Sequence, residues 1–394
     1  MRYDLHTCTL VLVQQGQQIL ISNAYPYQSI SVKTITLDSS ANIVVNGLLH
    51  WPQTLLGKGT IDATSGSINI EKDSLIINPY VFKNKLIYTL QIDAKNKVQF
   101  LDSLIIANSI TLFNGSLQTK HLTLLPTAQI NSSGNNTAII GPATVHKSYH
   151  LKEGQTKLLS FPFLNQPSLL DFKKSVRITG KGGSSRGFDS AVHENASAHF
   201  LDTTTGTNAL LSFNPFTKMD SSFWEQNRAI KIWLYPNDTG LINETPFIET
   251  KKHNAWIHVS IDGIPQHGPL EINFPEHPLA RYYLTGNPYP AAIDMRKISS
   301  STNIGKYYWY WDAGLGATGN YTASAFRFPK IVQKLEGYII KNNAGAAGYL
   351  FYEERTKVNH GDTPDTISYK KEYAHISLQF MKDNNLLDRL EILG

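Results

Sequence analysis

The stretch GSINIEKDSLIIN, residues 66–78, holds two short runs of β-type sequence, SINI and SLII, separated by charged residues. Side chains of a strand point alternately to its two faces, so short apolar and alternating runs indicate buried or half-buried strands. Similar runs recur through residues 17–145, and Gly, Asn, Asp or Ser interrupts most of them. Examples are SVKTITL (31–37), ANIVVN (41–46), DSLIIA (102–107) and SITLF (109–113).

A repeat of about ten residues without a helical period fits a β-solenoid, a sandwich or a barrel. The runs resemble one another loosely, as xSLxI, xSIxI and xSLxT, and few strong hairpin dipeptides join them. Both features favour a solenoid, in which each coil stacks its inward Ile, Leu and Val side chains on the coil below. A β-sandwich stays the alternative for this part of the chain.

The pattern changes after the turn-rich segment NSSGNNTAIIGP, residues 131–142, beyond which aromatic residues become dense. We therefore predict an all-β protein with a β-solenoid-like repetitive domain at residues 1–145. An aromatic-rich antiparallel β-sandwich domain follows at 146–372, and residues 373–394 begin a further β-module or form a C-terminal tail. Helical signal is weak everywhere, and its best candidates are residues 287–297 and 384–393.

Composition excludes several classes of protein. The net charge is only +5 over 394 residues and no block of five Lys or Arg occurs, so nucleic acid is not an expected partner. No stretch approaches the roughly 18 apolar residues of a membrane-spanning helix, and we expect no membrane insertion. The single cysteine, Cys8, rules out an intrachain disulfide.

The segment GNPYPAAID, residues 286–294, predicts a rigid structural corner. Pro288 and Pro290 lack backbone donors and fix two φ angles, so they cannot lie inside a sheet. Gly286 is expected to supply torsional freedom, and Asn287 to take the extended conformation that precedes proline. Asp294 is expected to cap a backbone donor after one helical turn at 291–293, with Tyr289 packed as a lid over the sandwich edge.

An enzymatic alternative pairs Asp294 with Asp312, because glycoside hydrolysis uses two carboxyl groups about 5 to 10 Å apart. Convergence of these residues with Glu353 and Glu354 in one cleft would favour it. The glycine pattern at 314–319 precedes a strand-like run, whereas a dinucleotide site requires a helix there. No catalytic residue and no metal ligand is therefore assigned.

The run YYWYW places rings on both faces of one strand. Tyr307, Trp309 and Trp311 are candidates for stacking on sugar rings, and filling of the core on both faces is the other interpretation. No cofactor is expected, except that oxygen ligands in loops such as 237–240, or at Asp202, could hold a structural Ca²⁺.

Several motifs occur in a characteristic order: TKLLSFPF (156–163), ITG (178–180), GNPYPAAID, YWYWD (308–312), GNY (319–321) and LEGYIIK (335–341). This order resembles the non-catalytic β-rich region of Bacteroidetes surface proteins that the type IX secretion system exports. Met295 stands where that family has Trp, so the local packing there can differ. No export leader is recognised, and we interpret the chain as a fragment or processed region of a longer exported protein.

The resemblance implies an extracellular, cell-surface protein. It also implies O-glycosylation at Asp-Ser/Thr-apolar triplets, whose acceptors are Ser74, Ser103, Ser190 and Thr366. We expect a non-enzymatic structural or adhesin-like protein whose partners are surface glycans or other cell-surface proteins. The alternatives are a carbohydrate-active enzyme, either a polysaccharide lyase or a glycoside hydrolase, and a scaffold that self-assembles into filaments.

Overall fold

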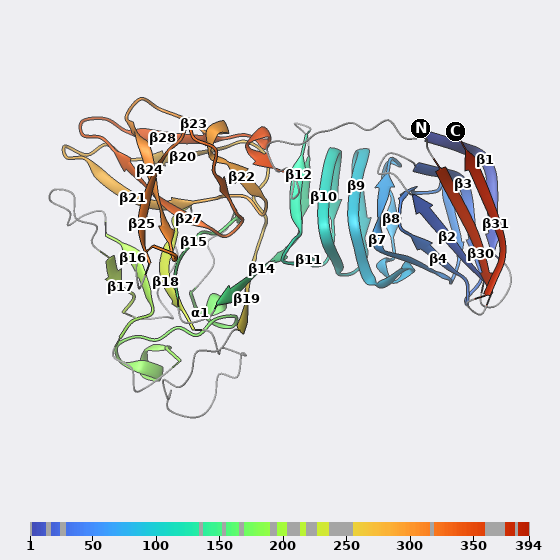
Figure 1. Ribbon diagram of the computed structural model, residues 1–394, viewed down its shortest axis with the longest axis horizontal. Coiled ribbons are helices and arrows are strands. Elements are labelled where there is room, and N and C mark those ends of the chain that lie inside the picture. The colour runs from blue at the N-terminus through green and yellow to red at the C-terminus, as the bar shows by residue number, and fades with distance from the viewer. Residues whose placement is uncertain are drawn as a thin grey trace. The chain divides into compact units, whose positions relative to one another are not determined.

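The computed structural model describes residues 2–12, 17–23, 29–133, 137–151, 155–164, 169–189, 195–202, 213–217, 227–235, 255–315, 319–358, 375–382 and 385–393. The chain forms two compact units (Figure 1). Unit 1 comprises Met1–Ala143 together with Gly361–Gly394, and unit 2 comprises Thr144–His360. The first boundary thus falls two residues before the predicted one, and the C-terminal segment returns to unit 1.

Unit 1 is a β-solenoid of about six turns, which confirms the all-β prediction and favours the solenoid over the sandwich. Strands of successive coils pair in parallel. The main strands are β3 (Ser29–Leu37), β4 (Asn42–Val45), β5 (Leu48–His50), β6 (Thr54–Gly57), β7 (Thr60–Ile70), β8 (Ile76–Ile77), β9 (Phe82–Phe100), β10 (Leu104–Gln118), β11 (Leu122–Leu124), β12 (Gln129–Ser132) and β13 (Ala138–Ile140).

An aliphatic ladder holds the coils together. Leu49, Ile68, Leu90, Ile110 and Ile130 occupy matching positions on successive parallel strands, and each is completely buried. Burial of one such side chain is worth about 1.5–3 kcal/mol, so a stack repeated in every coil can hold the solenoid without disulfides. The alternation seen in the sequence is therefore the alternation between this ladder and the solvent-facing side chains.

The C-terminal residues pair with the N-terminal part of the same unit. β30 (His375–Lys382) is antiparallel to β2 (Gln17–Asn23), and β31 (Asn385–Leu393) is antiparallel to β30. The helix expected at 384–393 was therefore wrong, because this segment pairs along its length with β30, and tertiary pairing outweighs a weak local helical preference.

Unit 2 is built from antiparallel sheets. The strands of the first sheet, in order, are β15 (Gln155–Leu159), β18 (Ile230–Leu234), β16 (Ala198–Leu201) and β17 (Phe213–Pro215). The second has β21 (Arg281–Gly286), β27 (Gly337–Asn342), β24 (Ile304–Asp312) and β25 (Asn320–Ala325). The third has β20 (Leu270–Phe274), β28 (Gly348–Tyr352) and β23 (Ser299–Ser300), and the fourth has β26 (Ile331–Val332), β22 (Ala292–Asp294) and β29 (Lys357–Val358).

The sheet β21-β27-β24-β25 is covered on both faces. Tyr308 and Ile340 pack on one face in a large core with residues of β20 and β28. Leu284 and Ile339 pack on the opposite face with Leu158 of β15. The alternation of side chains along β21, β24 and β27 therefore supplies two cores, and unit 2 is layered as a sandwich with an additional sheet.

Helices are short throughout the described residues. The α-helix α1 covers Leu169–Lys173, and the 3-10 helices are η1 (Pro79–Val81), η2 (Gly183–Arg186), η3 (Met295–Lys297) and η4 (Glu354–Thr356). Among the residues that the structure describes, no helix is long and apolar enough to cross a bilayer.

Candidate functional site

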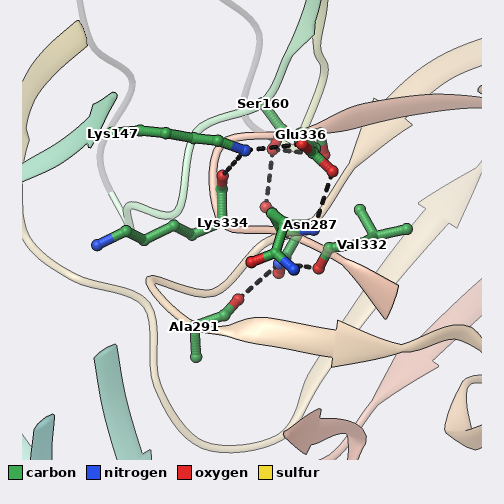
Figure 2. Close-up of polar contacts among 8 residues, drawn as sticks. Lys147, Ser160, Asn287, Ala291, Val332, Lys334 and Glu336 are labelled. Carbon is green, nitrogen blue, oxygen red and sulfur yellow. Dashed lines mark hydrogen bonds and ion pairs between the residues drawn. The ribbon is translucent and has the colours of Figure 1, made fainter. Parts of the chain in front are cut away.

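The predicted corner is present, and Asn287 is its centre. The Asn287 side chain is completely buried. Its Nδ2 donates to the carbonyl oxygens of Ala291 (2.6 Å) and Val332 (3.2 Å), and its Oδ1 accepts from the backbone N–H of Tyr289 at 2.9 Å. Pro288 and Pro290 have no backbone N–H and so cannot donate strand hydrogen bonds. The Asn287 side chain instead supplies hydrogen bonds to the backbone groups of this segment. Figure 2 shows the donated bonds.

A second set of polar contacts fixes the backbone on either side of the corner (Figure 2). Ser160 Oγ lies 2.9 Å from the Asn287 carbonyl and 3.0 Å from that of Glu336. Lys147 Nζ donates to the Lys334 carbonyl at 3.0 Å and to Glu336 Oε1 at 2.8 Å. Burial lowers the pKa of Lys147, although Glu336 opposes the shift. These groups hold a turn in place.

Two details of the corner differ from the prediction. Gly286 closes β21 without a positive φ; a Cβ there would lie 2.4 Å from Ser160 Cβ, so glycine is needed for close approach rather than for torsional freedom. Tyr289 is fully buried in the core and is not a lid. Residues 292–294 form β22, and the helical turn follows as η3 instead of preceding Asp294, because strand pairing with β26 and β29 takes those residues.

The candidate carboxylates are each held by their own neighbours. Asp294 caps η3 by accepting from the N–H of Arg296, and it also pairs with the guanidinium at 2.7 Å. Burial raises the pKa of Asp294, but the bonds from Arg296 outweigh it, so the pKa lies below its ordinary value. Asp312 accepts from the N–H of Gly314 in a turn. Glu353 pairs with Arg355, and Glu354 with Lys357.

The three candidate sugar-stacking rings differ in exposure. Trp309 and Trp311 pack against the core formed by Leu158, Ala229, Leu284 and Ile339, and each meets a tyrosine ring edge-on, Tyr282 and Tyr321 respectively. Tyr307 is 52% exposed. Of the three, Tyr307 therefore presents the most open ring, and the other two serve mainly as core.

The remaining predicted sites are placed as follows. Ser74 lies in an exposed turn with a positive φ of 54°, and Ser103 is half-buried just before β10. Ser190, Thr366 and the loop 237–240 lie outside the described residues. Asp202 accepts from Asn214 Nδ2 at 2.9 Å. Within the described ranges no cluster of three or more His, Cys, Asp or Glu side chains could hold a metal.

Sequence reasoning did not find a pocket of about 350 Å³ in unit 2. Ligand sites commonly measure about 300–1,000 Å³, so the pocket has room for one or two sugar rings. Its described lining combines hydroxyl and amide groups with cations and rings. These residues are Thr156, Arg177, Thr179, Asn195, Ala196, Ser197, His199, Lys231, Trp233 and Tyr235.

Strand register explains why these side chains meet. On β18, Ile230, Ile232 and Leu234 are buried, so Lys231 and Trp233 point to the other face. Thr156 of β15 is the direct partner of Trp233, and His199 of β16 is the direct partner of Lys231. Three adjacent strands thus contribute to one wall of the pocket.

The segments that carry Arg177, Thr179 and Ser197 have a well-fixed backbone. Thr179 and Ser197 exchange backbone and side-chain bonds of 2.9–3.0 Å, and Ser197 also accepts from the N–H of Trp233 at 2.7 Å. The neighbouring Ile178 N–H donates to Asp189 at 2.7 Å. Arg177 and Thr179 are therefore carried on a segment that is positioned before any ligand arrives.

The pocket is electropositive. Arg177, His199 and Lys231 line it, and no Asp or Glu is among its described lining residues. Burial lowers the pKa of Lys231. Burial and then the charge of Lys231 lower the pKa of His199, so this imidazole is largely neutral near pH 7.

One sequence signal could have identified this wall. In the run IKIWLY, residues 230–235, Lys231, Trp233 and Tyr235 alternate with three aliphatic residues, which is the pattern of a strand with one buried face. No sequence pattern around Arg177 or His199 indicates that these residues line the pocket. None of the protein-family models, curated proteins and solved structures compared with this chain matches it.

Proposed function

We propose that the chain is an extracellular, non-enzymatic protein of a bacterial surface, in which the solenoid is a structural module and unit 2 binds glycans. The observation that carries this proposal is the lining of the pocket in unit 2. An indole that is 36% exposed stands beside hydroxyl and amide groups. A ring face flanked by fixed hydrogen-bonding groups is a common arrangement for holding a sugar.

Two further observations support the proposal. The repeated coils of the solenoid form a module that a ladder of buried aliphatic side chains holds together. The order of motifs from residue 156 to 341 resembles the β-rich region of exported Bacteroidetes surface proteins. The resemblance supports an extracellular location, and the pocket supports binding through unit 2.

A glycan array with matched variants tests the proposal. Trp233→Ala removes the ring of the pocket, whereas Tyr307→Ala removes the exposed ring of β24. Phe328→Ala is the control, because Phe328 is 51% exposed and does not line the pocket. We expect Trp233→Ala alone to weaken binding by up to about tenfold, because stacking on one ring contributes roughly 0.5–1.5 kcal/mol.

Other outcomes have definite meanings. Loss of binding in Tyr307→Ala instead would move the site to β24. Absence of binding by the wild-type chain to every glycan would remove the glycan proposal, and release of shortened products from any bound polysaccharide would contradict the non-enzymatic part of it. Sedimentation at high protein concentration separately tests self-assembly.

A further inference from the structure

The pocket holds a cation in an unusual environment. Lys231 Nζ lies 4.8 Å from the centre of the Phe213 ring, 5.3 Å from that of Trp311 and 5.9 Å from that of Tyr321. These rings attract the ammonium through their electron-rich faces. Lys231 forms no ion pair with an acidic side chain among the described residues.

Two other nitrogen-bearing groups line the same cavity. His199 is the cross-strand partner of Lys231. The Arg177 guanidinium lies over the ring of Tyr235 at 5.7 Å, on the loop fixed by Thr179 and Ser197. Three nitrogen-bearing groups thus line one cavity, whose described lining includes no carboxylate.

We propose that the pocket selects acidic saccharides, with the carboxylate or sulfate of the sugar bound by Lys231, His199 and Arg177 and its ring packed on Trp233. This inference rests on the proposed glycan-binding function and specifies its ligand class. A neutral sugar would satisfy the hydroxyl and amide groups but would leave the partly desolvated ammonium of Lys231 without a counter-charge among the described residues. An acidic sugar satisfies both, and charge-assisted hydrogen bonds are the stronger kind.

The arrangement also predicts proton uptake on binding. An anion beside His199 favours its charged form and so raises the pKa that burial and Lys231 lower in the free protein. The other titratable or charged groups that line the pocket are Arg177, Lys231 and Tyr235. A merely structural role for His199 would give no proton uptake that depends on the ligand charge.

Isothermal titration calorimetry on the full chain tests the inference with three probes. These are a galacturonic acid trisaccharide, its methyl-esterified counterpart and a sulfated galactose oligosaccharide. We expect the acid to bind about tenfold or more tightly than the ester, more weakly as salt is raised, and with proton uptake near pH 7. Comparison of the first and third probes distinguishes carboxylate from sulfate.

Matched variants locate the effect. Lys231→Met keeps most of the side-chain volume and should abolish the preference for acid over ester. Lys330→Met is the control, because Lys330 Nζ also lies over a ring, at 4.1 Å from that of Tyr310, but does not line the pocket. Retained near-ultraviolet circular dichroism shows that each variant is folded.

The results separate the two proposals. Equal binding of acid and ester, both lost in Trp233→Ala, would overturn the acidic ligand class and leave glycan binding in place. Acid preference that survives Lys231→Met would also overturn the inference. Binding of none of the three probes, together with an empty glycan array, would remove both.

Discussion

The strongest stability prediction concerns Asn287→Ala in the corner of unit 2. The substitution deletes bonds to the carbonyl oxygens of Ala291 and Val332 and to the N–H of Tyr289, all at buried positions. A buried polar group left without a partner costs about 1–3 kcal/mol. Allowing for partial relaxation, three such groups predict a loss of roughly 3–6 kcal/mol, a large fraction of the 5–15 kcal/mol by which most domains are stable.

Urea unfolding followed by tryptophan fluorescence measures this loss, because five of the six tryptophans lie in the sequence of unit 2. The control is Asn273→Ala, at an exposed position of β20, which should change the free energy of unfolding by less than about 0.5 kcal/mol. The two units can unfold separately, so the transition of unit 2 must be fitted by itself. A loss below about 1 kcal/mol for Asn287→Ala would refute the view that this amide organises the corner.

Three further predictions follow from buried or strained groups. Burial and then the charge of Lys147 lower the pKa of Lys334 to about 7. The folded state therefore binds fewer protons than the unfolded state between pH 7 and 10.5, and stability falls as pH falls through that range. Lys334→Met should raise the free energy of unfolding most at pH 7 and progressively less toward pH 10, and a constant difference across that range would contradict this. Glu336→Gln should destabilise unit 2 by about 1–3 kcal/mol in urea, since it removes the charge partner of Lys147, whose side chain is 12% exposed, although the Glu336 side chain itself is 38% exposed; a loss under about 0.5 kcal/mol would show that the pair is dispensable. Gly57→Ala should lower the thermal midpoint of the solenoid in circular dichroism, since φ is +93° and a Cβ would lie 1.7 Å from the Leu37 carbonyl oxygen, and an unchanged midpoint would refute that packing.

The solenoid could be predicted because its determinants are local and repeated. Each coil reads as a short apolar run followed by small polar residues, and the same pattern places Ile68, Leu90 and Ile110 in one ladder. The pairing of β30 with β2 could not be predicted in this way. It joins strands from opposite ends of the chain, and neither strand's sequence indicates which other strand it pairs with. The stretches DSLIIN and DSLIIA agree at their second isoleucine, since Ile77 and Ile106 are both buried, whereas at the first isoleucine Ile76 is 62% exposed and Ile105 is half-buried.

The corner was predicted as a corner, but its mechanism required the three-dimensional contacts. Two prolines within three residues predict that the backbone leaves the sheet, because proline cannot donate a strand hydrogen bond. That Asn287 supplies the missing bonds, and that Gly286 is present because Ser160 lies against it, depends on residues far away in sequence. The close approach of Ser160 explains why residue 286 is glycine, but the sequence around residue 286 shows only the glycine and not the neighbour that requires it.

The pocket was missed because alternation along a strand shows that two faces exist but does not show what covers them. Near Ala229, the face of the β18 sheet that carries Lys231 is covered by Leu284 and Ile339. Farther along the same face, the rings of Trp311 and Tyr321 reach the ammonium of Lys231, and beyond it Trp233 is partly exposed. This face of β18 thus passes from core to pocket between Ala229 and Trp233, a change that depends on residues of other strands and not on the alternation along β18 itself.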